Sequence, residues 1–137
     1  MKRYFLIFYS LLAVLGLSSC DLDDDSPNFH FTALQITSVE LPESFDLNGT
    51  YEVKVTYVRP DGCTFFEGFD FVKEDVTVRN VVAVGSVRTD QACTAAIEEE
   101  EATFIFVVLF DEPYTFRFWQ GTEDGMDEYF EVEVPVN

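Results

Sequence analysis

The sequence predicts an all-β domain built as a sandwich of short antiparallel strands. Beyond residue 28, apolar and polar residues alternate over short stretches, and turn signals separate these stretches at roughly 8–12-residue spacing. Phe, Val and Tyr dominate the apolar residues of this region, and such side chains fit a pleated, half-buried surface. No helix-like pattern exceeds two turns. We therefore expect one domain at 29–137, with a modest core.

Seven extended segments follow one another in this domain. Turn signals bound them, such as Asn48-Gly49 before the second strand and Pro60-Asp61-Gly62 after it. The fourth strand changes the parity of its apolar residues near Asn80 and Gly85, which predicts a bulge. A short helix is expected at 94–100. Six strands are expected at 31–41, 50–58, 76–87, 102–110, 114–120 and 128–136. The third strand in chain order is expected to have Phe65, Phe69 and Phe71 on one face.

The number and spacing of these strands are typical of an immunoglobulin-like sandwich. The run Asp111-Glu112-Pro113-Tyr114-Thr115-Phe116 resembles the corner that opens strand F in that family, with Tyr114 as the corner tyrosine. The cysteines depart from the antibody pattern, because neither Cys63 nor Cys93 lies two residues after Tyr114. The lone Trp119 also falls outside strand C. The expected fold is a seven-stranded immunoglobulin-like or fibronectin-like antiparallel sandwich.

The N-terminal residues have the pattern of a secretory signal. Lys2 and Arg3 precede a mostly apolar run at 4–17, which is too short for a membrane-spanning helix of about 20 residues. Leu17-Ser18-Ser19-Cys20 resembles the lipobox of bacterial lipoproteins. In that family the leader is cut before the cysteine, which then carries a diacylglyceryl group and a fatty acid such as palmitate. The resemblance implies a signal peptide at 1–19 and a stable membrane anchor on Cys20.

An acidic stretch after Cys20 predicts a short disordered tether at 20–28. In one group of Gram-negative bacteria such a run resembles a signal for export to the cell surface, whereas elsewhere Asp directly after the cysteine marks inner-membrane retention. The length of the run favours the outer membrane and the surface. The whole chain is similar to small bacterial lipoproteins without an assigned activity, which share the lipobox, the tether, a Pro-Asp-Gly-Cys turn and a Tyr-Thr-Phe-x-Phe-Trp-x-Gly strand.

The charge of the chain argues against a nucleic-acid partner. The net charge is −18, and cleavage before Cys20 would leave 6 basic against 26 acidic residues, or −20. Such a surface repels phosphate backbones. Lipidation of Cys20 would leave Cys63 and Cys93 as a pair, which we expect to form a disulfide outside the cytoplasm. A zinc site is disfavoured, because His30 is the only histidine.

Residues suited to catalysis are scarce, so we expect no enzyme and no cofactor. His30 lies at the end of the tether, and Ser86 lacks the Gly-x-Ser-x-Gly elbow of hydrolases. The acidic run 123–128 includes Asp124, Asp127 and Glu128, which form a weak calcium candidate. A solvated loop between the last two strands is the favoured interpretation, and no metal site is expected.

The last two strands predict their own register. Pairing Phe118 with Phe130 places Trp119 opposite Tyr129 and Arg117 opposite Glu131, and a one-residue slip would spoil both faces of the pair. The favoured interpretation of Trp119, Tyr129 and Arg117 is structural. The alternative is an exposed aromatic contact for a protein or glycan partner.

These features together predict a lipid-anchored envelope protein that acts as a non-enzymatic binding or structural module. An accessory subunit of a surface uptake or adhesion complex is the alternative within that class. A small hydrolase is the alternative from another class.

Overall fold

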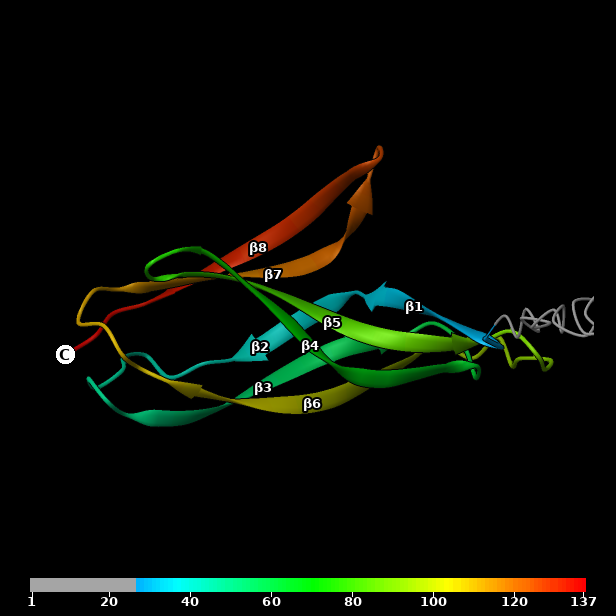
Figure 1. Cartoon of the computed structure of the whole chain (residues 1–137), viewed down its shortest axis with the longest axis horizontal. Coiled ribbons are helices and arrows are strands. Elements are labelled where there is room, and N and C mark those ends of the chain that lie inside the picture. Colours follow the sequence, from blue (N-terminus) through cyan, green and yellow to red (C-terminus); the bar gives the residue numbers. More distant parts are fainter. Residues whose placement is uncertain (1–26) are drawn as a thin grey trace, which may run out of the picture.

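The computed structural model describes residues 27–137, which form a sandwich of two β-sheets (Figure 1). The fold is all-β and immunoglobulin-like in architecture, as expected. The leader, the lipobox and most of the tether lie outside the described residues. Within residues 27–137, no helix is long and apolar enough to cross a membrane. The strands are β1 Phe29–Leu34, β2 Ile36–Glu40, β3 Thr50–Arg59, β4 Thr64–Asp75, β5 Val78–Arg88, β6 Glu98–Val107, β7 Tyr114–Glu123 and β8 Met126–Val134.

The expected first strand is divided between the two sheets, which makes eight described strands instead of seven. β1 pairs with β5 in the larger sheet, whereas β2 pairs with β3 in the smaller one. Gln35 lies at the junction, where its carbonyl accepts the N–H of Val58 at 2.8 Å. The strand changes sheets here because Leu34 and Ile36 are both needed in the core, where each is at most 2% exposed.

β5 is the centre of the larger sheet. The order is β1-β5-β7-β8, with β4 on the opposite edge of β5, and the smaller sheet has the order β2-β3-β6. β1 and β7 share one edge of β5: β7 lies beside residues 78–81 and β1 beside residues 83–88.

The β5–β7 pair is parallel, which corrects the expectation of a wholly antiparallel sandwich. After β6 the chain crosses to the larger sheet, and β7 begins at the same end of that sheet as β5. There the N–H of Thr115 donates to the carbonyl of Thr77 at 2.9 Å. Since both strands start at the same end, they run in the same direction.

One hydrophobic core lies between the sheets. Side chains alternate along β3 as predicted, with Val53, Val55 and Tyr57 buried. Burying each large apolar side chain contributes about 1.5–3 kcal/mol. The core consists of Leu34, Ile36, Phe45, Val53, Val55, Tyr57, Val81, Ala83, Phe104, Val108, Tyr114, Phe116, Phe118 and Val134.

Two bulges fall on β4, and not on its partner β5 near Asn80 and Gly85 as expected. The extra residues are Glu67 and Glu74, where the β4–β5 register shifts. The carboxylate of Glu67 accepts the hydroxyl of Ser86 at 2.6 Å, and that of Glu74 accepts the amide of Asn80 at 2.7 Å. The bulges therefore supply hydrogen-bond partners for two buried polar side chains of β5.

The first bulge also corrects the faces expected for this strand. The extra residue Glu67 reverses the two-residue alternation, so Phe66, and not Phe65, shares the inward face with Phe69. The Phe66 ring stacks on Tyr57 with centroids 5.0 Å apart, and Phe69 packs against Phe104 at 5.3 Å. Phe65 is 43% exposed.

The expected helix at 94–100 does not form. Residues 89–97 make a loop, and β6 begins at Glu98 beside Arg59 of β3. The Arg59 guanidinium lies 2.9 Å from the Glu100 carboxylate and 3.9 Å from that of Glu98. Because pairing with β3 satisfies the backbone and the cation neutralises adjacent acids, the glutamate run is held as a strand.

Tyr114 occupies the corner position that its sequence context indicates. It is fully buried at the start of β7. Its hydroxyl accepts the backbone N–H groups of Leu109 at 3.2 Å and Phe110 at 3.1 Å. This bond back to the preceding connection is the geometry of a tyrosine corner.

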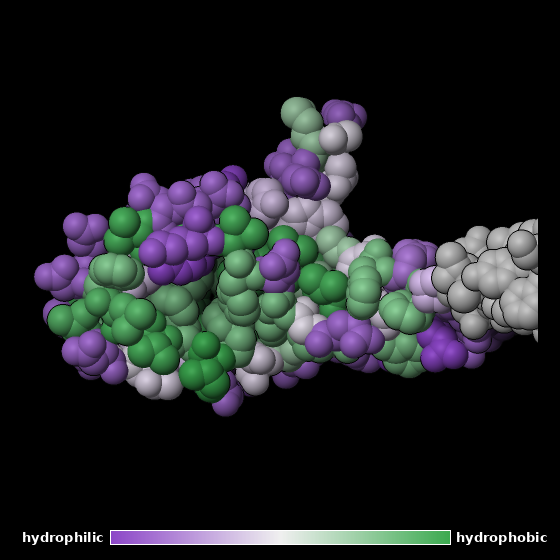
Figure 2. All heavy atoms as spheres, viewed as in Figure 1, coloured by the Kyte–Doolittle hydropathy of each residue, from purple (hydrophilic) through white to green (hydrophobic). Residues whose placement is uncertain are grey.

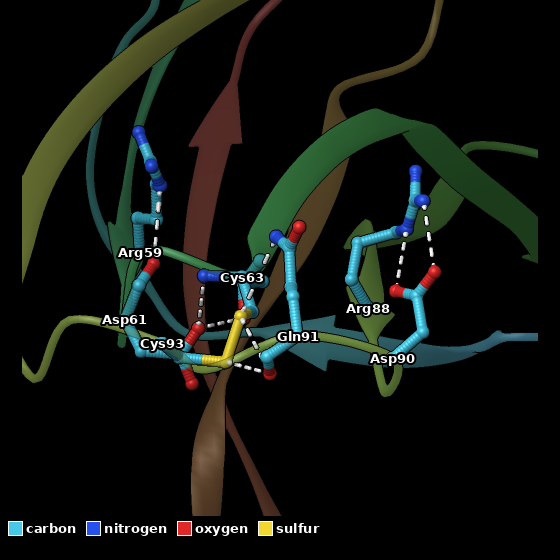
Figure 3. The surroundings of a disulfide bond; sticks show 8 residues. Arg59, Asp61, Cys63, Arg88, Asp90, Gln91 and Cys93 are labelled. Atoms are coloured by element: carbon cyan, nitrogen blue, oxygen red, sulfur yellow. Dashed lines mark hydrogen bonds and ion pairs between the residues drawn. A yellow bond between two sulfur atoms is a disulfide. The ribbon is translucent and has the colours of Figure 1, made fainter.

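The Cys63–Cys93 disulfide joins the turn before β4 to the loop before β6 (Figure 3). The two Cα atoms are 5.2 Å apart. Asp61 accepts the N–H of Cys63 at 2.9 Å and the hydroxyl of Thr64 at 2.8 Å, which holds the predicted turn. At the other end of the loop, a hydrogen bond from Arg88 lowers the pKa of the Asp90 carboxyl.

Candidate functional site

β7 and β8 pair in the register that the sequence predicts. Phe118 lies opposite Phe130, Trp119 opposite Tyr129 and Arg117 opposite Glu131. On the core side, the Phe118 and Phe130 rings stack with centroids 5.3 Å apart.

The end of this hairpin, residues 119–130, leaves the sheet and projects from the sandwich; we call it the arm (Figure 1). β7 pairs with β5 only as far as Phe118, beside Val81. The next place along that edge of β5 is taken by Leu34 of β1, which pairs with Ala83. β7 cannot continue along β5 and bends away, with a bulge between Trp119 and Gly121.

A tight two-residue turn closes the arm. Asp124 and Gly125 both have positive φ, at 52° and 78°, and the flanking residues Glu123 and Met126 pair directly. Two successive positive φ angles are typical of the type I′ hairpin turn, for which Asp-Gly is a favoured sequence. The acidic run is therefore mostly strand and not an open loop.

An open cleft of about 600 Å³ lies between the arm and the body of the sandwich. Cavities of this size are typical of ligand sites. Five consecutive residues of β7 line one side, whereas β8 contributes only Glu128. The opposite side comes from the β1–β2 junction and the end of β3. The lining residues are Ala33, Leu34, Gln35, Val58, Pro60, Trp119, Gln120, Gly121, Thr122, Glu123 and Glu128.

The chemistry of the cleft is apolar on the body side and polar or acidic on the arm. Ala33, Val58 and Pro60 provide the accessible apolar part. Glu123 and Glu128 bring two carboxylates, and no basic residue lines the cleft within the described part of the chain. The site therefore suits a ligand that combines apolar surface with positive charge.

The residues predicted as candidate binding residues, Trp119, Tyr129 and Arg117, share the outer face of the β7–β8 hairpin, with Arg117 just before the arm. The Arg117 guanidinium lies 4.7 Å from the Tyr129 ring centroid and 3.1 Å from the Glu131 carboxylate. The indole N–H of Trp119 donates to Asp127 at 3.0 Å. Their polar groups thus bind one another across the hairpin, and of the three only Trp119 reaches the cleft.

The three acids of the calcium candidate do not share one face. Asp127 accepts hydrogen bonds from Trp119 and Thr122 on the outer face. Glu128, the next residue, faces the cleft, and Asp124 lies in the turn. In residues 27–137, no group of three or more His, Cys, Asp or Glu side chains is arranged to hold a metal ion.

A polar cluster on β3 and β6 lies near the cleft but faces another way. Burial, followed by the hydrogen bond to Glu100, raises the pKa of Tyr57 to about 12. The hydroxyl donates to Glu100 at 3.0 Å, and hydrogen bonds from Arg59 and Tyr57 lower the pKa of that carboxyl. The cluster joins the two strands and gives the Glu100 carboxylate two hydrogen-bond donors.

Exposed apolar residues gather at the end of the sandwich far from β1 (Figure 2). Val107, the last residue of β6, and Leu109 and Phe110 of the β6–β7 connection are 45%, 65% and 36% exposed. The Lys73 ammonium lies 5.4 Å from the Phe110 ring centroid at its edge. This surface is separate from the cleft.

Sequence reasoning located one side of the cleft and missed the other. Trp119 and the acidic hairpin carried visible signals, as did Gly121, which interrupts the alternation of β7. Ala33, Gln35 and Val58 reach the site only because the first strand changes sheets. No local sequence pattern predicts that a strand will pass from one sheet to the other.

Comparison with protein-family models, with curated proteins and with solved structures found no match to this chain.

Proposed function

We propose that the protein is a lipid-anchored module of the bacterial cell envelope that binds a partner and catalyses no reaction. The observation that carries the binding role is the cleft between the arm and the body. The lipobox-like Leu17-Ser18-Ser19-Cys20 supports the anchor. The partner is a protein or a glycan, and the membrane is contacted through the lipid on Cys20.

The arrangement of the fold supports this role. A sandwich with one continuous core is a rigid support. The arm is an extension of β7 and β8, which stay paired with each other as far as the turn. The acidic stretch after Cys20 supports a position at the outer membrane, exposed on the surface.

The exposed apolar end of the sandwich favours the related role of an accessory subunit in a surface uptake or adhesion complex. Val107, Leu109 and Phe110 lie at the end opposite the start of β1 (Figure 1). In an anchored protein that end points away from the tether, where a larger subunit could contact it.

Site-specific photo-crosslinking in intact cells tests the proposal. A photoreactive benzoylphenylalanine at Gln120, inside the cleft, should give a discrete covalent adduct, whereas the same group at Thr103, exposed on β6, should not. Radioactive palmitate should label the chain, and Cys20→Ala should abolish both labelling and the adduct. Labelling that persists in Cys20→Ala would refute the anchor, and equal adducts from both positions would refute the binding role.

A further inference from the structure

The edge of the arm that faces the cleft is an unpaired strand edge. β8 covers one edge of β7 along its whole length. β5 covers the other edge only as far as Phe118, and among residues 27–137 no strand pairs with that edge over 119–123. The N–H of Thr115 points toward β5, and N–H groups along a strand point to the same side at every second residue. The N–H of Trp119 therefore points to the same side, but Trp119 lies past Phe118, the last residue of β7 that pairs with β5.

Two other free edges of the sandwich, those of β4 and β6, carry features that hinder pairing, whereas the arm edge has one bulge at Gln120 and pairs regularly with β8 over residues 121–123. β4 has bulges at Glu67 and Glu74, and β6 begins with four consecutive glutamates. Bulges and charged residues are the usual protection of an edge strand. Residues 119–122 of the arm, Trp-Gln-Gly-Thr, carry no charge.

We propose that the cleft binds an extended, positively charged polypeptide segment that adds as a short strand to the 119–123 edge of the arm. Because Gln120 is a bulge residue, this edge presents four ladder positions, which span about 13 Å and suit a segment of about four residues. Backbone hydrogen bonds to the edge would supply the affinity, as in other strand-addition sites. Alternate side chains of the segment would meet the apolar floor at Ala33, Val58 and Pro60.

The charge of the site selects a basic segment. Glu123 and Glu128 line the cleft, and the precursor as a whole carries a net charge of −18. A negative field of this kind attracts cations over a distance of about one Debye length. A glycan is the weaker candidate, because the indole N–H of Trp119 is bound to Asp127 and is not available to a sugar hydroxyl.

This inference rests on the proposed function, and a peptide of defined chemistry tests it separately. The probe is a capped seven-residue peptide of alternating lysine and valine, added to the purified full-length ¹⁵N-labelled chain in detergent micelles. Amide shifts should map to residues 119–123. A peptide N-methylated at two adjacent central residues, which blocks both of its edges, should bind at least ten-fold more weakly. A glutamate-valine peptide should also bind at least ten-fold more weakly.

Matched variants test the role of the two acids. Glu123→Gln with Glu128→Gln should weaken the lysine peptide at least three-fold at low salt. Glu52→Gln with Glu101→Gln, exposed on the smaller sheet, makes the same charge change and should leave binding unaltered.

Three results would overturn the inference: equal binding of the N-methylated peptide, shifts confined to β4 or β6, or no shift at millimolar peptide. If crosslinking at Gln120 still captures a glycan, the binding role stands while the polypeptide assignment falls. If neither the crosslinking nor the peptide titration detects a partner, the binding role and the polypeptide assignment are both refuted.

Discussion

Tyr57 illustrates how one buried hydroxyl links the two long strands of the smaller sheet. It is 3% exposed, faces the core and still reaches Glu100 on β6. Arg59 approaches the same carboxylate from the next inward position of β3. A half-buried carboxylate that had only one of these donors would lose hydration without full compensation. The pair of donors explains why Glu100 occupies an inward position beside the core.

The raised pKa of Tyr57 predicts a specific pH dependence of stability. The folded chain holds this proton more tightly than the unfolded chain, whose tyrosine pKa is about 10. The stabilisation is therefore complete below pH 10 and is lost as the pH rises through about 12. Tyr57→Phe should cost about 1–3 kcal/mol at pH 8 and progressively less toward pH 12. Urea unfolding of both proteins across this range measures the difference, and a constant difference would contradict the assignment.

The arm is an element whose stability comes from its own ladder and turn. Past the Phe118–Phe130 pair, the residues on this side of the hairpin are Gln120, Gly121 and Glu128, which line the cleft. Apolar packing against the body therefore ends where the arm begins. Asp127, bound by Trp119 and Thr122, joins its two strands on the outer face. Elements with few buried apolar contacts open locally more often than the core.

A substitution in the turn should therefore act on the arm alone. Gly125 has φ 78°, and an alanine in this left-handed conformation costs about 1–2 kcal/mol. Gly125→Ala should raise hydrogen exchange at residues 119–130 about ten-fold and leave the global urea midpoint nearly unchanged. Gly68→Ala is the control, because that glycine has no positive φ and its added methyl would meet open space. A large shift of the global midpoint in Gly125→Ala would show that the arm is part of the cooperative core.

At the scale of the whole molecule, the disulfide constrains a loop that little else holds. The residues between Arg88 and Glu98 are exposed and belong to no strand, yet Cys93 is bonded to the fully buried Cys63. The bond spans 30 residues and connects the two sheets through β4, β5 and β6. It therefore limits the freedom of the unfolded chain across the middle of the domain.

Removing this bond should lower the free energy of unfolding by about 3–4 kcal/mol, the chain-entropy value for a loop of this length. Urea denaturation of Cys63→Ala with Cys93→Ala against the wild type measures the loss. Intact-mass measurement after thiol alkylation provides the control, and non-reduced wild type should show no alkylation at these two positions. Two alkylated cysteines there, or a loss below about 1 kcal/mol, would contradict the role given to the bond.

Much of the fold could be predicted because its signals are local. The alternation in β3, the Asp-Gly turn and the paired faces of β7 and β8 each depend on neighbouring residues. Tyr114 was found in the same way, from the corner sequence around it. The short helix at 94–100 was predicted wrongly, because the strand there depends on Arg59 and Tyr57, which lie about 40 residues earlier.

The sequence by itself determined the all-β class, the turns and the register of the last hairpin. A period of two residues excludes a one-residue slip, because that slip would reverse both faces of the β7–β8 pair. Tertiary structure alone decided which strand takes which edge of β5. β1 and β7 compete for that edge, and because Leu34 occupies the place beside Ala83, the hairpin bends away and a cleft opens beside it. The candidate site is thus a consequence of contacts between strands about 80 residues apart, which no local pattern encodes.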